Sequence, residues 1–224
     1  MIPLRDVIPS RTTPGVTITL IVLNVAVYLL QLLLTDQGQD AFLIGFGLVP
    51  AYFSLLNAFT AMFVHGGLAH LGGNMLFLWI FGDNVEDRLG HGRFVAFYLL
   101  CGFAAAIAQT ALNPNSLVPM VGASGAIAGV MGAYLVLYPH SRVLMLFPFP
   151  VFLFELPAVV FLVIWFLIQF LNGVNQLPIF ERNAISGGVA FWAHVMGFVA
   201  GLILVVFMKR PERTKVEWWD TIES

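Results

Sequence analysis

The sequence predicts an all-α, polytopic membrane protein with six transmembrane helices. Three observations support this fold class. Hydrophobic residues make up 59% of the 224 residues. Only 10% of the residues are charged, where an average soluble domain carries about 25%. Apolar runs of about the length that crosses a bilayer recur along the chain. We therefore expect a single membrane domain over residues 1–224, with its core at about 16–208 and short tails at 1–15 and 209–224.

Composition also excludes several other classes of protein. The 21 Phe and 5 Trp have no place in a solvated disordered chain. A net charge of -2 with no basic block gives no footprint for nucleic acid. The single cysteine, Cys101, rules out an intrachain disulfide framework and a cysteine-based zinc site.

Six segments have the apolar character of helical spans. They cover about residues 16–34, 68–81, 94–112, 124–138, 157–171 and 189–208. Pro157 suits the first turn of the fifth segment. The second and fourth segments are short, so we expect them inside the bundle, without contact to lipid along their whole length.

Two connections have a distinct composition. Residues 35–64 are apolar and aromatic but interrupted by Gly and Pro, which favours a partly embedded element at the external surface. Residues 174–188 contain Pro178 and the Gly187-Gly188 pair, typical of a flexible external loop that could cover a site below it.

The basic residues predict the orientation, because Lys and Arg gather on the cytoplasmic side. With six spans, nine of the ten fall on the side of both termini, and only Arg182 falls opposite. The nine are Arg5, Arg11, Arg88, Arg93, Arg142, Lys209, Arg210, Arg213 and Lys215. Both termini are therefore expected to be cytoplasmic. The short tails and the lack of a signal or transit peptide favour a prokaryotic cytoplasmic membrane.

Polar groups inside spans are costly and therefore mark candidate sites. Five of them fall at similar depths near the external ends of the second, fourth and sixth spans: His65, His70, Asn74, Ser124 and His194. The apolar runs and the basic residues alone give this topology, and it places all five groups at a similar depth. We therefore expect them to form one site.

Ser124 lies at the predicted start of the fourth span, between Gly122 and Gly125. Glycine allows a sharp turn into the helix. The free N–H groups and positive dipole of a helix N-terminus can stabilise an oxyanion. The structural alternative is a serine that simply caps a helix packed through glycines.

His194 lies one turn before Gly197, which with Gly201 forms a small-xxx-small face. Gly125 and Gly129 offer a matching face on the fourth span. Contact between the two faces would bring the imidazole close to Ser124. The alternative is a buried histidine bonded to a backbone carbonyl.

His70 and Asn74 are four residues apart and share one helix face, so both could donate hydrogen bonds to an oxyanion beside Ser124. Their alternative role is hydrogen bonding between helices. His65, one turn earlier, is expected to be structural.

The residues that other kinds of membrane enzyme or a transporter would need are missing. A metalloprotease helix needs His-Glu-x-x-His, whereas Gly66 follows His65 and Leu71 follows His70. The aspartates lie outside the spans or at their ends, and no midplane charges or paired broken helices indicate a transporter. We expect no metal and no cofactor, which leaves serine chemistry.

Three motifs resemble the rhomboid family of intramembrane serine proteases. They are His65-Gly-Gly-Leu-Ala-His70-Leu-Gly-Gly-Asn74, Gly122-Ala-Ser124-Gly125 and Ala193-His194-Val-Met-Gly197. The resemblance covers nearly the whole chain and implies a six-helix rhomboid-like bundle with a partly embedded first external loop.

By the resemblance, Ser124 would be the nucleophile and His194 its general base. His70, Asn74 and the backbone N–H of Ser124 would form the oxyanion hole. Glu86-Asp-Arg88 would anchor the cytoplasmic end of the second span. Inactive members typically lack the serine or the histidine, and this chain keeps both.

The chain departs from the family pattern at two places. Leu56-Asn57 stands where many members have Trp-Arg in the first external loop. Ala128 stands where some members stack a tyrosine on the catalytic histidine, so other packing must hold His194.

The resemblance also implies substrates: membrane proteins, usually with a single span, that are cut in or beside that span. We expect entry past the fifth span, where Phe161 and Trp165 lie four apart on one face; the alternative is that both face lipid. Two other functions stay open: a catalytically silent rhomboid-like protein that binds membrane clients, and a small channel or transporter.

Overall fold

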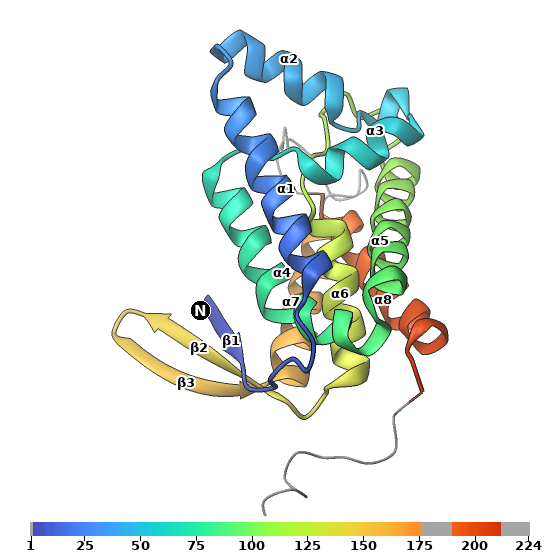
Figure 1. Cartoon of the computed structure of the whole chain (residues 1–224). Helices are drawn as coiled ribbons and strands as arrows, with labels where there is room; N and C mark the ends of the chain where they lie inside the picture. Colours follow the sequence, from blue (N-terminus) through green and yellow to red (C-terminus); the bar gives the residue numbers. More distant parts are fainter. Residues whose placement is uncertain (1, 176–189, 212–224) are drawn as a thin grey trace, which may run out of the picture.

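The computed structural model describes residues 2–175 and 190–211. Helices run side by side between two ends of a bundle, with α2 and α3 at one end and a three-stranded sheet at the other (Figure 1). The helices are α1 (Gly15–Leu32), α2 (Asp36–Phe46), η1 (Pro50–Tyr52), α3 (Leu55–Thr60), η2 (Ala61–Phe63), α4 (Leu68–Leu89), α5 (His91–Leu112), α6 (Ser124–Leu137), α7 (Ala158–Asn175) and α8 (Phe191–Met208). The strands are β1 (Ile2–Asp6), β2 (Arg142–Pro148) and β3 (Val151–Pro157).

Four helices in the described part of the chain are long and apolar enough to cross a membrane: α1, α5, α7 and α8. The chain is therefore a multi-pass membrane protein. Helix α6 is apolar but has only 14 residues, and α4 has 22 residues but a charged C-terminal half. Six spans remain a prediction, since α4 and α6 do not meet the length and polarity of a span independently.

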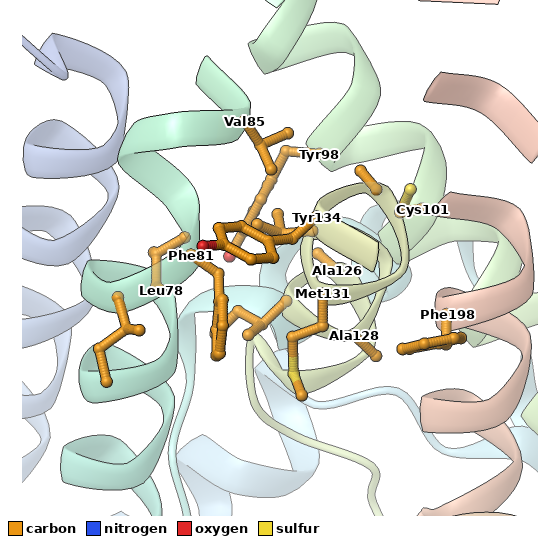
Figure 2. Packing of buried hydrophobic residues seen from close by; sticks show 14 of the residues in the cluster. Leu78, Phe81, Val85, Tyr98, Cys101, Ala126, Ala128, Met131, Tyr134 and Phe198 are labelled. Atoms are coloured by element: carbon orange, nitrogen blue, oxygen red, sulfur yellow. The ribbon is translucent and has the colours of Figure 1, made fainter. Parts of the chain in front are cut away.

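Helix α6 lies at the centre and packs against α4, α5 and α8. Figure 2 shows the buried residues around it, including Phe81 of α4, Tyr98 and Cys101 of α5, and Phe198 of α8. Phe81 meets Tyr134 of α6 edge-on, with ring centroids 5.0 Å apart, a favoured geometry for an aromatic pair. Helix α6 is thus enclosed by neighbours on several sides.

The second predicted span ended too early. It was expected to end at Phe81, but α4 continues through the charged stretch to Leu89. The charges are tolerated because they have partners. Glu86 is completely buried and accepts hydrogen bonds from the backbone N–H groups of Val16 and Thr17, at 2.9 and 2.8 Å. These are free donors at the start of α1, so Glu86 ties α1 to α4.

The prediction of an all-α fold was wrong at the end of the bundle that carries the N-terminus. Strands β1, β2 and β3 form an antiparallel sheet in that order. Residues 142–157 are rich in aromatic and aliphatic side chains and turn at Pro148-Phe149-Pro150, a strand and turn pattern. The expected N-terminal tail therefore contributes a strand in its first six residues.

At the opposite end, residues 35–64 fold into α2, η1, α3 and η2. Thr35 and Ser54 cap α2 and α3 by accepting from the backbone N–H groups of Gly38 and Asn57. Leu48 pairs with Met120 through two backbone hydrogen bonds, which connects this element to the segment that leads into α6. The segment was expected to lie at the surface, and it is mainly helical.

Nine basic residues are predicted on the side of the two termini. Seven of them are among the described residues, and they lie at the sheet end. The backbone N–H of Arg11 donates to the side-chain carboxylate of Asp87 in α4, and the backbone N–H of Arg210 donates to the carbonyl of Arg88. The side chain of Arg93 donates to the carbonyl of Met208. The others are Arg5 in β1, Arg88 in α4, Arg142 in β2 and Lys209 after α8. Arg182, Arg213 and Lys215 lie outside the described residues.

Candidate active site

Ser124 is the first residue of α6, and Gly122 just before it has a φ of +113°. Only glycine adopts that conformation without strain, which explains the turn into the helix. With 14 residues α6 is about 21 Å long, and its neighbour α5 with 22 residues is about 33 Å long. Ser124 therefore lies well inside the end of the bundle, as Figure 1 shows for the start of α6.

The structure brings Ser124 and His194 into contact. Ser124 Oγ lies 2.8 Å from His194 Nε2, and His194 Nδ1 lies 2.8 Å from Oε1 of Gln169 in α7. An amide oxygen can only accept, so Nδ1 carries the proton and Nε2 is the acceptor for the serine hydroxyl. This is the tautomer that a general base needs.

Aromatic rings enclose the imidazole of His194. The ring centroid of Trp165 in α7 lies 5.9 Å from that of the imidazole, and the centroid of Phe191, nearly perpendicular to it, lies 6.5 Å away. Trp165 also packs on Phe198 at 6.0 Å. These side chains occupy the supporting role that the sequence left without a candidate, since Ala128 stands at the position of the family's stacking tyrosine.

Glycines let α6 and α8 approach to backbone contact. A Cβ added to Gly197 would collide with the carbonyl oxygen of Gly125, and one added to Gly201 with that of Gly129. Helices can approach this closely only through small residues. Because Gly125 follows Ser124 directly and Gly197 lies one turn after His194, this contact sets the distance between serine and imidazole.

His70 and Asn74 lie against Gly122. A Cβ on Gly122 would come within 2.6 Å of His70 Nε2 and 3.3 Å of Asn74 Nδ2. Asn74 Nδ2 also lies 2.8 Å from His65 Nε2 and donates to it. Thus His70 and Asn74, two potential hydrogen-bond donors, lie beside Gly122, which precedes Ser124 by two residues. They are on the side of α6 that faces the start of α4.

His65 is completely buried, and its surroundings are those of a structural residue. Its ring meets that of His70 edge-on at 5.1 Å. Its carbonyl accepts a hydrogen bond from Gln31 of α1 at 3.0 Å. His65 therefore connects α1 to the two side chains beside Gly122.

A cavity of about 20 Å³ lies beside Ser124, enough for about one water molecule. Its walls are made mostly of small residues, among them Ala58, Ala61 and Gly102, with Met62 and Met120 as the largest. The site can thus hold a small group next to the serine hydroxyl.

Phe161 and Trp165 lie on the inner side of α7. Phe161 stacks on Phe77 and Phe81 of α4, at 6.2 Å from each, and Trp165 packs on His194. Both are only partly exposed, so the alternative that they simply face lipid does not describe their contacts. Their predicted part in substrate entry stays a proposal.

Sequence reasoning missed Gln169, which contacts His194, and Gln109 of α5, whose Oε1 accepts from the backbone N–H of Ala193 at 3.2 Å. The signal was available, because an amide inside an apolar span needs a partner. The predicted external loop 174–188 lies outside the described residues beyond Asn175. Across the described residues, no cluster of three or more His, Cys, Asp or Glu could hold a metal ion.

Known proteins match this chain over most of its length. The Rhomboid domain family model matches residues 52–211, which is most of the chain. The Rhomboid protease AarA of Providencia stuartii is 27% identical over 222 residues, covering 90% of this chain and 75% of that protein. The match to this relative thus extends over nearly the whole chain.

Two further relatives match over shorter segments. The Rhomboid protease GluP of Bacillus subtilis is 42% identical over 83 residues, 37% of this chain and 16% of that protein. Rhomboid protein 1, mitochondrial, of Saccharomyces cerevisiae is 37% identical over 102 residues, 44% of this chain and 29% of that protein. This chain therefore spans only a small part of the length of these two relatives. With the family model matched over residues 52–211 and the relatives named as rhomboid proteins, the chain belongs to the rhomboid family.

Proposed function

We propose that the protein is an intramembrane serine endopeptidase that uses Ser124 and His194 as a catalytic dyad. The observation that carries the proposal is the 2.8 Å contact between Ser124 Oγ and His194 Nε2, with Nδ1 engaged by Gln169. A hydroxyl whose proton points at an unprotonated imidazole nitrogen is a nucleophile with its base in place.

The reaction follows from these two groups. Ser124 Oγ attacks the carbonyl carbon of the scissile peptide bond while His194 Nε2 takes the hydroxyl proton. The tetrahedral intermediate collapses, the C–N bond breaks, and the leaving amine takes that proton from the imidazolium. Water then attacks the acyl ester by the same route, giving a free carboxyl end and restoring Ser124.

Gln169 differs from the aspartate of a catalytic triad in being neutral. It orients the imidazole through the Nδ1–H bond and adds no full charge to stabilise the imidazolium. Gln169 is thus a positioning residue, and the dyad works without a carboxylate.

The oxyanion would be held at the start of α6. The backbone N–H of Ser124 lies at a helix N-terminus, and His70 and Asn74 stand beside Gly122 as side-chain donors. Donors fixed in advance where charge develops stabilise the transition state more than the ground state.

The chain has six spans in this proposal, with α4 and α6 shielded by the other helices. The site opens to the external side, both termini are cytoplasmic, and the membrane is the cytoplasmic membrane of a prokaryote. The gathering of Arg5, Arg88 and Arg142 at the sheet end supports this orientation.

Substrates are membrane proteins, most with one span, and the reaction uses neither a metal nor a cofactor. A substrate helix must unwind locally, because its peptide carbonyls are otherwise hydrogen-bonded within the helix. Entry between α4 and α7 is supported by the stack of Phe161 on Phe77 and Phe81, because side-chain contacts such as these join the two helices and can open.

Fluorophosphonate labelling of the purified protein in liposomes tests the proposal. We expect labelling of the wild type and none of Ser124→Ala or of His194→Ala, together with cleavage of a model single-span substrate by the wild type only. Ser116→Ala is the matched control, since Ser116 lies in the loop after α5, away from the imidazole. A folded wild type that neither labels nor cleaves would favour the silent client-binding alternative, and solute flux across the liposome would favour a channel.

A further inference from the structure

The hairpin of β2 and β3 has two chemically different faces. Side chains alternate across a strand, and the register pairs Val143 with Leu156, Met145 with Phe154, and Phe147 with Phe152. These six residues share one side, which we call the bundle face. The other side, the outer face, carries the charged pair Arg142 and Glu155 among apolar residues: Leu144, Leu146, Pro148, Val151, Leu153 and Pro157.

The inner part of the bundle face is covered by the helices. Val143 and Met145 are completely buried in the main core cluster, and Phe154 and Leu156 pack against it. Asp6 of β1, paired with Val143, reaches in the same direction and accepts from Tyr134 Oη at 2.7 Å. The bundle face therefore points along the helices, toward the membrane interior.

The outer part of the same face extends beyond the helices. Figure 1 shows the hairpin projecting sideways from the end of the bundle, with its turn far from the helices. There Phe147, Phe152 and Phe154 form a row of rings, with neighbouring centroids 5.1 and 5.6 Å apart. Phe152 is 47% exposed and Phe149 in the turn 88% exposed, so protein leaves this aromatic row partly uncovered.

The charged side chains of the sheet lie on the outer face. Arg142 and Glu155 form an ion pair of 3.1 Å, and both belong to the outer face. Arg5 of β1 pairs with Leu144 and so lies on that face as well. A sheet with aromatic rings on one side and cations with a carboxylate on the other matches the gradient from hydrocarbon to headgroups.

The hairpin is also continuous with a surface that faces lipid. β3 ends at Pro157 and α7 starts at Ala158, and α7 exposes a row of aliphatic side chains. These are Val160, Val163, Ile164, Leu167, Ile168 and Leu171. Lipid that contacts the first turns of α7 therefore adjoins the uncovered part of the bundle face.

We propose that the β2–β3 hairpin is an interfacial membrane anchor that lies flat under the lipid beside the bundle. Phe147 and Phe152 face the hydrocarbon of the nearer leaflet, next to Phe154 on the core, and the outer face lies among headgroups and water. The occupant of the aromatic row is lipid, and the anchor fixes the chain at the point where α6 connects to α7. This role is independent of the activity of Ser124.

Site-directed spin labelling tests the anchor in nanodiscs, where both membrane surfaces are open to reagents. A nitroxide is placed on Phe152→Cys of the bundle face or on its neighbour Leu153→Cys of the outer face. Arg5→Cys serves as an aqueous reference. Cys101 is completely buried, and the labelling reaction on the wild type gives the blank. Power saturation then compares collisions with oxygen, which concentrates in hydrocarbon, and with a water-soluble nickel chelate.

The ratio of oxygen to nickel collisions is expected to be several-fold higher at position 152 than at 153, and lowest at position 5. Equal ratios at 152 and 153, whether both high or both low, would mean that the two faces share one environment and would overturn the anchor. Low collision with both reagents at 152 would mean that protein covers the row, which also overturns it. If Phe152→Cys does not fold, judged by its melting temperature, Phe147→Cys and Leu146→Cys form the equivalent pair on β2.

Discussion

His194 donates a hydrogen bond from Nδ1 to the amide oxygen of Gln169, 2.8 Å away, and faces Ser124 with its other nitrogen. One residue of α7 thus selects the tautomer of an imidazole carried by α8. This arrangement makes α7 part of the site as well as part of its boundary.

Gln169→Leu removes the acceptor and keeps a side chain of similar size. We expect kcat to fall roughly 5- to 10-fold, the value of one hydrogen bond of about 1 kcal/mol, with KM nearly unchanged. Steady-state cleavage of a model substrate measures both constants. Gln169→Glu restores an acceptor and should recover activity. An unchanged kcat in the leucine variant would remove Gln169 from the site.

Phe161 and Trp165 should respond in opposite directions when shortened. Phe161→Ala removes the stack on Phe77 and Phe81, so it should raise cleavage of a membrane-embedded substrate. Trp165→Ala removes the ring beside His194, so it should lower cleavage. A soluble unstructured peptide is the control, because its cleavage should be insensitive to Phe161. Equal loss in both variants would contradict entry between α4 and α7.

Gly201→Ala should destabilise the protein by about 1–3 kcal/mol, the usual cost of overpacking. Its added methyl group collides with the carbonyl of Gly129. Gly92→Ala, in α5, is the matched control because its methyl group meets open space. Thermal unfolding in detergent measures both variants. Similar melting temperatures for the two would show that α6 and α8 can separate without cost.

Burial raises the pKa of Asp6 above its ordinary value of 3.8, against the hydrogen bond from Tyr134. A carboxyl group with a raised pKa favours the folded state when protonated, and that contribution is lost as pH rises through the raised value. Asp6→Asn keeps one oxygen to accept from both Tyr134 and Asn84 and never ionises. Its melting temperature relative to the wild type should therefore be higher at pH 7 than at pH 3.5. An equal difference at both pH values would contradict the raised pKa.

The sequence predicted the site best where the spacing of residues along a helix allows only one arrangement. Gly197 and Gly201 lie four residues apart, so they form one face of α8 in any helix, and that face meets Gly125 and Gly129. The contact of Ser124 with His194 follows from that register. Helix periodicity alone decides which of these residues share a face of their helix.

Other features depend on information that periodicity does not contain. Gln169 reaches His194 only because of how α7 is rotated against α8, and no repeat within α7 specifies that rotation. The charged end of α4 continues as helix because Glu86 finds the backbone of Val16 and Thr17, 69 or more residues away. The sheet forms because β1 supplies a third strand from the distant N-terminal segment.

The touching backbones of α6 and α8 also bear on how a peptide bond could ever reach the serine. The carbonyl groups of Gly125 and Gly129 already lie against Gly197 and Gly201, so Ser124 and His194 are held together as one stiff unit. Motion that admits a polypeptide must therefore come from elements that rest on this unit through side chains, and α7 with its aromatic contacts is such an element. Since Gln169 and Trp165 of the same helix also contact His194, tightening α7 should slow admission and hold the imidazole more firmly at the same time.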